Sequence, residues 1–110
     1  MTNLLHRKCQ TLEGGTPMSD AEIHSHLTQV SGWHLNGGAI EKTFVFRNYY
    51  ETIAFVNALA WICNTEDHHP ELAVSFDRCV VRFDTHSVKG VSINDFICAA
   101  KADALVAFVG

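Results

Sequence analysis

The apolar positions of this chain follow a helical period in three stretches and a strand period in two hairpins. The first helical stretch starts at Ser19, which can cap the amide of Glu22 while the Glu22 carboxylate returns to the Ser19 amide. Ile23, Leu27 and Val30 then fall on one side of the predicted helix. The sequence therefore predicts a short, capped helix that buries one face.

Residues 33–47 predict a β-hairpin. The Asn-Gly-Gly run at 36–38 supplies residues that tolerate the positive φ angles of a tight turn. After the turn, Ile40, Phe44 and Phe46 fall on one face, with polar residues on the other. This pattern indicates a sheet with one face in the core and one face in solvent.

A second hairpin is predicted for residues 72–86. Apolar residues alternate over 72–76 and again over 81–85, with a turn at Asp77 and Arg78 between them. His86 is expected to close the last strand. Short turns join antiparallel strands, so we expect all four strands to lie in one antiparallel sheet.

A long helix is predicted between the hairpins, from about residue 49 to about residue 64. Asn48 is its expected cap, and Pro70 disfavours helical angles at His69, so the helix must end before the histidine pair. The apolar residues that form its expected inward stripe are Ile53, Phe55, Val56, Leu59, Ala60, Ile62 and Cys63. This helix is expected to be mostly buried.

A final helix is predicted to open at Ser92, with Asp95 as its cap partner. The residues expected to face inward are Phe96, Ala99, Ala100, Ala104 and Phe108. The resulting order is helix, two strands, helix, two strands, helix. We therefore predict an α+β fold in which three helices pack on one face of a four-stranded antiparallel sheet.

Length and composition add limits to this picture. The chain has 110 residues, of which 47% are hydrophobic and 18% charged, as expected for one compact, soluble domain over residues 1–110. Residues 1–18 lack an apolar period and are expected to form a flexible lead-in. The start does not resemble a secretion signal, and no apolar run approaches the roughly 18 residues that span a membrane. A cytoplasmic protein without a membrane partner is expected.

Charge and cysteine spacing exclude further classes. A net charge of −4 disfavours a nucleic-acid surface, because affinity for phosphate comes mainly from clustered Lys and Arg. Cys9, Cys63, Cys79 and Cys98 form no C-x-x-C pair, which disfavours a zinc knuckle and a thioredoxin-like site. Free thiols in a reducing compartment are therefore expected.

The candidate chemistry lies in Asp67-His68-His69-Pro70, after a predicted helix end, and in His86, at a predicted strand end. One interpretation is a solvated helix terminus, where a cationic imidazole is favoured by about 0.3–1 kcal/mol. Metal binding is disfavoured, because adjacent residues in an extended segment point opposite ways. Acid–base work suits the residues better, since histidine titrates near neutral pH and a neighbouring carboxylate such as Asp67 can orient an imidazole. The histidines expected to be surface residues are His6, His24, His26 and His34.

These motifs together resemble a known family. Asp-His-His-Pro after a long apolar helix, then a hairpin, then "THSVKGVSINDFICAAKAD" at 85–103 resembles the pterin-4a-carbinolamine dehydratases, from about residue 19 to about residue 103. The resemblance implies a hydro-lyase without a metal or another cofactor, which removes water from 4a-hydroxytetrahydropterin to give quinonoid dihydropterin. It also implies a functional link to aromatic amino acid hydroxylases and assembly as a homodimer or homotetramer.

The same resemblance implies roles for individual residues. His68 and His86 would exchange protons with the 4a-hydroxyl group and ring N5, while His69 would chiefly position the pterin. Asp67 and Pro70 would contact the substrate beside His69. Which histidine is the acid and which the base stays open.

One position departs from the family pattern, and one alternative function is open. Many members carry an acidic residue three positions before the Asp of Asp-His-His-Pro, where this chain has Asn64, with Glu66 acidic instead. The alternative is a non-catalytic binding module, such as a transcriptional dimerisation cofactor or an assembly chaperone. The presence of three imidazoles favours catalysis.

Overall fold

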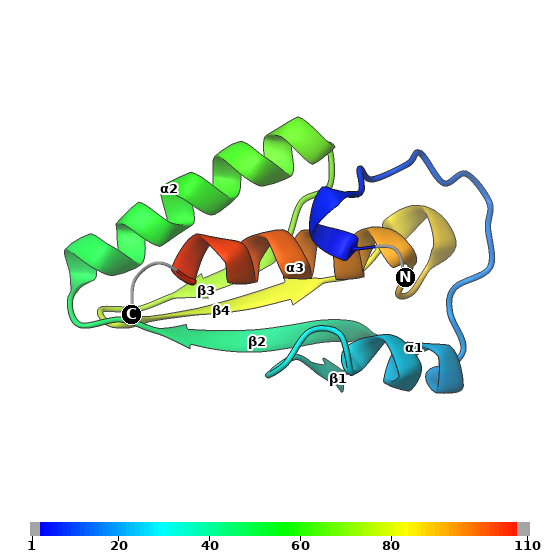
Figure 1. The fold of residues 1–110 in the computed structure, drawn as a ribbon, viewed down its shortest axis with the longest axis horizontal. Helices are drawn as coiled ribbons and strands as arrows, with labels where there is room; N and C mark the ends of the chain where they lie inside the picture. Colours follow the sequence, from blue (N-terminus) through cyan, green and yellow to red (C-terminus); the bar gives the residue numbers. More distant parts are fainter. Residues whose placement is uncertain (1–2, 108–110) are drawn as a thin grey trace.

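Four strands form one antiparallel sheet at the centre of the structure (Figure 1). The structure is a computed structural model that describes residues 3–107. In spatial order the strands are β1 (His34–Asn36), β2 (Ala39–Val45), β4 (Arg78–Phe83) and β3 (Glu71–Val74). Every neighbouring pair is antiparallel, so the predicted sheet is confirmed.

The helices of the fold are α1 (Asp20–Leu27), α2 (Tyr49–Glu66) and α3 (Ile93–Val106). Two short 3-10 turns, η1 (Leu4–His6) and η2 (His86–Val88), complete the order. The predicted α+β class and the order of helices and strands are confirmed. In the part of the chain that the structure describes, none of the helices has the length and apolar character needed to cross a membrane.

The helices cover one face of the sheet. The buried side chains on that face are Ile40, Phe44, Cys79, Val81 and Phe83. The ring centroids of Phe44 and of Phe55 from α2 are 4.7 Å apart, so α2 packs on this face. The other face is open, and Val45 on β2 is 64% exposed there. The alternation of apolar and polar residues along β2 follows from this one-sided burial.

Local sequence signals set the starts of α1 and α3 and the first hairpin turn as predicted. Ser19 and Ser92 both cap their helices through complete capping boxes. The first hairpin turns at Gly37 and Gly38, whose φ angles of 59° and 84° are both positive. A two-residue turn of this kind matches the twist of the strands it joins, which fixes the register of β1 on β2.

Helix α2 faces the core with a narrower stripe than predicted, which keeps Phe55, Leu59 and Cys63 of the predicted residues. Its buried residues are Thr52, Phe55, Leu59, Cys63 and Glu66. Ala60, predicted to face inward, is exposed, and Tyr50 and Trp61 are 83% and 74% exposed. The prediction of a mostly buried helix is therefore wrong. Most sides of α2 are apolar, so the helical period alone did not decide which side meets the sheet.

The second hairpin is shorter than predicted, while α3 is more deeply buried. β4 ends at Phe83, and His86 begins η2 instead of closing a strand, because Thr85 pairs with Gly90 in an isolated bridge. In α3, the buried residues beyond those predicted to face inward are Asn94, Asp95, Ile97, Cys98 and Ala102. Phe108, predicted to face inward, lies outside the described residues.

Parts of residues 4–18 pack on the folded domain, although residues 1–18 were predicted to form a flexible lead-in. Leu4 is buried in the core, and η1 lies beside α3 (Figure 1). At the other end of the segment, the Met18 amide donates to the Val91 carbonyl at 2.8 Å. Single anchors and backbone hydrogen bonds leave no periodic signal in a sequence, which explains the difference.

The stripe of α2 can be tested by two neighbouring substitutions. Leu59→Ala should lower the free energy of unfolding by about 3 kcal/mol, because it opens a cavity among fully buried side chains. Ala60→Gln should change it by less than about 0.5 kcal/mol, because this position faces away from the sheet. Urea unfolding followed by circular dichroism measures both. Equal losses in the two variants would show that Ala60 also faces the core.

Candidate functional site

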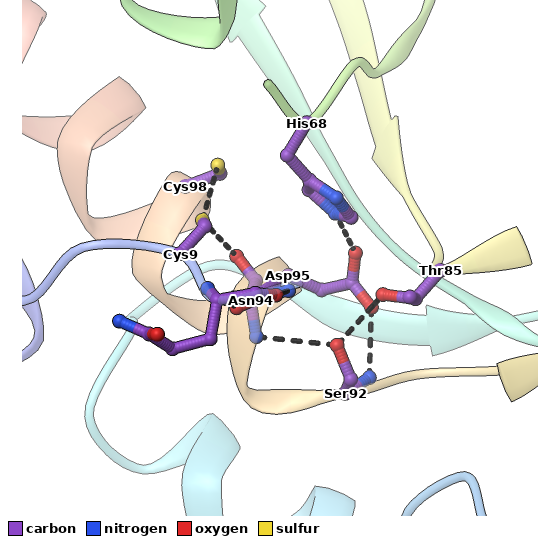
Figure 2. Close-up of polar contacts among 8 residues, drawn as sticks. Cys9, His68, Thr85, Ser92, Asn94, Asp95 and Cys98 are labelled. Carbon is purple, nitrogen blue, oxygen red and sulfur yellow. Dashed lines mark hydrogen bonds and ion pairs between the residues drawn. The ribbon is translucent and has the colours of Figure 1, made fainter. Parts of the chain in front are cut away.

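A buried carboxylate lies at the start of α3. Asp95 is 0% exposed, and its Oδ2 accepts hydrogen bonds from the Ser92 amide and the Thr85 hydroxyl, both at 2.8 Å (Figure 2). The Thr85 and Ser92 hydroxyl oxygens are 2.7 Å apart. Burying a carboxylate is costly unless it is paired. The donors around Asp95 and the N-terminus of α3 offset that cost.

The other oxygen of Asp95 binds His68. The His68 Nε2 atom lies 2.5 Å from Asp95 Oδ1, and the imidazole stacks on Phe83 with the ring centroids 6.0 Å apart. An ionised carboxylate only accepts hydrogen bonds, so we assign the ring hydrogen to Nε2. This leaves Nδ1 as the ring nitrogen that can exchange a proton with a ligand.

Three element ends bring these groups together. Asp67 caps α2 in a left-handed conformation, with a φ angle of 53°, and turns the chain so that His68 leaves the helix. Thr85 is fixed after β4 by its bridge to Gly90. Asp95 is fixed by the capping box of α3. The site is therefore built from local turn chemistry at segments that are distant in the sequence.

A polar pocket of about 520 Å³ lies beside His68. Its size is within the usual range for small-molecule sites. The end of α2 borders it with Asp67 and His68, the segment after β4 borders it with Thr85 and Ser87, and α3 borders it with Asn94. One end of this pocket thus carries the imidazole that Asp95 holds.

Residues 4–13, which we call the N-terminal strap, supply another wall of this pocket through residues 8–13. The buried Asn94 side chain holds the strap: its Oδ1 accepts from the Gln10 amide at 3.0 Å, and its Nδ2 donates to the Gln10 carbonyl at 2.7 Å. The Cys9 amide donates to Glu66 at 2.8 Å. These side-chain groups satisfy the hydrogen bonding of the strap backbone, as the backbone of a neighbouring β-strand would do in a sheet.

Glu66 ties α2, α3 and the strap together. Its Oε2 accepts from Lys101 Nζ at 2.6 Å, and its Oε1 accepts from the Cys9 amide. Burial alone would raise the pKa of the Glu66 carboxyl, but the hydrogen bonds from Lys101 and Cys9 outweigh burial and hold this pKa below its usual range. Glu66 is therefore a structural anion that stabilises the pocket wall.

The other residues predicted for the site lie around this pocket in different ways. Asp67 borders the pocket, whereas His69 and His86 are exposed and lie outside its lining. In residues 3–107, neither of these two imidazoles makes a side-chain hydrogen bond or an ion pair. Pro70 is half-buried just before β3. The roles of His69, His86 and Pro70 stay predictions.

The carboxylate that orients His68 is Asp95, and not the neighbouring Asp67 expected from the sequence. The exposed Asn64 does not reach this network, and Glu66 does not take the place of the missing acidic residue because it is bound to Lys101. Asp95 was predicted only as a helix cap. A capping box accounts for one carboxylate oxygen, and nothing in the local pattern indicates where the second one points.

One of the histidines expected to be surface residues differs from that expectation. His26 is half-buried, with its ring centroid 5.2 Å from that of Phe96. His34 is exposed as expected, and its Nε2 lies 3.6 Å from a carboxylate oxygen of Glu41. Both contacts come from tertiary packing or strand pairing. Neither imidazole borders the pocket.

A small α+β protein that holds an imidazole on a buried carboxylate, at the edge of a polar pocket, has the parts of an acid–base enzyme. Comparison with known families shows which family of enzymes this chain belongs to. The sequence model of the pterin 4 alpha carbinolamine dehydratase family matches residues 16–105, and the chain belongs to this family. The family resemblance and the hydro-lyase class predicted from the sequence are confirmed at this level.

Similar proteins support the same assignment. The chain is 55% identical to a protein of Bdellovibrio bacteriovorus named "Putative pterin-4-alpha-carbinolamine dehydratase", over 94% of this chain and 88% of that one. It is 48% identical to a protein of the same name from Chromobacterium violaceum, over 94% and 95% of the two chains. The crystal structure of a transcriptional coactivator/pterin dehydratase from Brucella melitensis matches with a TM-score of 0.78 at 29% identity. That match covers 82% of this chain and 98% of the Brucella chain.

The charge balance at Glu66 leads to a test by pH. A carboxyl whose folded-state pKa is depressed stabilises the fold above its unfolded pKa of about 4.3, and this stabilisation is lost as the pH falls through the folded value. Lys101→Met removes the main interaction that lowers the pKa of Glu66. The effect of burial then prevails, and the folded-state pKa of Glu66 rises. We expect this variant to be less stable than wild type by about 2 kcal/mol at pH 7, and by less at pH 4. Urea unfolding at both pH values measures the difference.

The double variant Glu66→Gln with Lys101→Met serves as the control. It removes both charges and leaves no buried anion without a partner. At pH 7 the double variant should be more stable than Lys101→Met and less stable than wild type. A difference between Lys101→Met and wild type that does not change with pH would contradict the assignment of Glu66 as a buried anion.

Proposed function

We propose that this protein dehydrates 4a-hydroxytetrahydropterin to quinonoid dihydropterin by histidine acid–base catalysis. The observation that carries the proposal is His68, held by the buried Asp95 at the edge of the pocket, in a chain of the dehydratase family. The reaction would recycle the pterin of aromatic amino acid hydroxylases in the cytoplasm. The four free cysteines are consistent with such a reducing compartment.

The reaction consists of two proton transfers and the cleavage of one C–O bond. The departing 4a-hydroxyl group takes up a proton and leaves as water, while ring N5 loses its proton as the C4a–N5 double bond forms. No electrons are gained or lost, so the proposal requires neither a redox cofactor nor a metal. A positioned acid and a positioned base are sufficient.

His68 is suited to one of these transfers. Asp95 fixes the orientation of the ring and stabilises the imidazolium form that appears when Nδ1 takes up a proton. Stacking on Phe83 limits rotation of the ring. In this proposal, Nδ1 is the atom that exchanges a proton with the pterin.

His86 is proposed for the second transfer and His69 for positioning the pterin, together with Asp67 and Pro70. His86 directly follows Thr85, whose hydroxyl donates to the same carboxylate that holds His68. The turn that carries His86 is thereby fixed relative to His68, although its own imidazole is exposed. This shared anchor supports a joint role for the two histidines.

The proposal predicts large losses of activity in two histidine variants. His68→Ala and His86→Ala should each slow dehydration by about 10²–10⁴-fold, the usual contribution of a positioned acid or base. His69→Ala should act mainly by weakening pterin binding. The rate is measured with an enzymatically generated 4a-hydroxypterin and corrected for the uncatalysed reaction, using protein dialysed against a strong chelator.

His24→Ala is the matched control, because His24 is exposed on α1 and, among residues 3–107, its ring bonds only to the Asp20 carbonyl. It should keep full activity. Asp95→Asn should slow the reaction about tenfold or more, because an amide can donate to Nε2 and favour the wrong tautomer. Near-normal dehydration rates in folded His68→Ala and His86→Ala would refute the catalytic proposal. A large loss of activity after chelator treatment that zinc restores would refute the metal-free mechanism.

We also propose a homodimer or homotetramer. Trp61 and Tyr50 on α2 are exposed, and the edge strand β3 is followed by Phe76, which is 63% exposed. An unpaired sheet edge and an apolar helix face are both surfaces that association buries. Sedimentation at micromolar concentration should show a species larger than the 12.2 kDa chain. A monomer alone would remove this proposal.

The alternative function is a binding module without catalysis. The similar protein from Brucella melitensis is named a transcriptional coactivator as well as a pterin dehydratase. The exposed aromatic residues of α2 would suit a protein partner. Absence of dehydratase activity in pure wild-type protein, together with stoichiometric co-purification of one partner, would favour this alternative.

A further inference from the structure

Three cysteines lie together behind the wall of the pocket, and the proposed dehydration uses none of them. The Sγ atoms of Cys9 on the strap and Cys98 on α3 are 3.6 Å apart (Figure 2). Cys9 Sγ also lies 3.6 Å from the Asn94 carbonyl, one helical turn before Cys98. Cys63 on α2 lies close enough to Cys98 for each to shift the pKa of the other thiol.

The three thiols differ in access. Cys9 is half-buried and belongs to the lining of the pocket. Cys63 and Cys98 are buried. The hydrogen bonds from Cys63 and Cys9, together with burial, raise the pKa of the Cys98 thiol, which keeps that thiol protonated. Cys9 is therefore the thiol that an oxidant meets first.

We propose that Cys9 and Cys98 form a reversible oxidation site for hydroperoxides, and that the resulting disulfide fastens the N-terminal strap to α3. In the first step the Cys9 thiolate attacks the peroxide oxygen, the O–O bond breaks, and Cys9 becomes a sulfenic acid as ROOH is reduced to ROH. In the second step the Cys98 sulfur attacks the Cys9 sulfur while the Cys98 thiol proton passes to the sulfenic hydroxyl group, which leaves as water. The two thiols lose two electrons and two protons in total.

The contact geometry favours this pair over the others. Cys98 lies directly behind Cys9, at a distance from which a small movement of the strap brings the two sulfurs to bonding distance. A Cys63–Cys98 disulfide would require an oxidant to reach two buried sulfurs. Cys79 is buried on β4 and takes no part in this cluster.

The bond would change how firmly the strap is held. In the reduced protein, hydrogen bonds from Asn94 and Glu66 to the backbone of residues 9 and 10 hold this part of the strap. Residues 9 and 98 are 89 positions apart, so a disulfide between them closes a long loop. Oxidation would suppress local opening of the strap and preserve this wall of the pocket. Cys9 lies outside the family match over residues 16–105 and Cys98 lies inside it, so the disulfide would join the unmatched strap to the matched part of the chain.

Trypsin provides a direct measure of strap opening, because it cleaves after Arg7 and Lys8, next to Cys9. Wild-type protein is treated with hydrogen peroxide and analysed by intact mass and peptide mapping. We expect the loss of two hydrogens and a Cys9–Cys98 cross-linked peptide. Native-state cleavage after Arg7 and Lys8 should be slowed about tenfold or more, and dithiothreitol should restore it.

Matched variants separate this site from general oxidation. Cys79→Ser and Cys63→Ser should keep both the cross-link and the protection, whereas Cys9→Ser should lose both. Asn94→Ala should speed cleavage of the reduced protein, and oxidation should slow it again. Circular dichroism confirms that each variant is folded.

Three results would overturn the proposal. The first is a Cys63–Cys98 or intermolecular disulfide in place of Cys9–Cys98. The second is Cys9 that stops at sulfinic acid without forming a cross-link. The third is a Cys9–Cys98 disulfide that leaves the cleavage rate unchanged. None of these readouts depends on dehydratase activity.

Discussion

The buried carboxylate of Asp95 is the constraint on which the functional region depends. An ion with no access to water must be surrounded by donors, and here the donors come from the segment after α2, the segment after β4 and the start of α3. Folding cannot bury Asp95 without bringing His68 and Thr85 to it. The energetic requirement of one side chain thus sets the position of an imidazole that lies 27 residues away in the sequence. Stability and chemistry share the same hydrogen bonds at this point.

The sequence was most informative where structure is decided by nearby residues. The capping boxes at Ser19 and Ser92 and the Gly37-Gly38 turn depend on contacts over two to four residues, and all were predicted. The family resemblance pointed to His68 before any geometry was known. The second oxygen of Asp95 and the anchoring of Gln10 by Asn94 were missed, because both contacts join residues far apart in the chain. No periodicity or spacing rule contains that information.

Helix α2 shows a different limit of sequence reasoning. Its apolar residues cover most of the helix surface, so several stripes satisfy the helical period equally well. The sheet selected the stripe that includes Leu59, and that choice left Trp61 in solvent. Exposed aromatic residues on a helix of this kind are consistent with a further layer of packing between chains. The period of a pattern therefore identifies the helix, and the complementary surface decides its rotation.

The N-terminal strap makes the pocket a two-part construction. Residues 16–105 carry the family match, the imidazole and its carboxylate, whereas the strap adds a wall from outside that match. The two parts meet through the buried Leu4 side chain, the Cys9 sulfur and backbone hydrogen bonds of residues 9 and 10. The exposed side chains of residues 8–13 can therefore diverge without disturbing the proton-transfer machinery. Such a modular wall offers evolution, or a protein engineer, a place to retune ligand selectivity while the reaction itself is conserved.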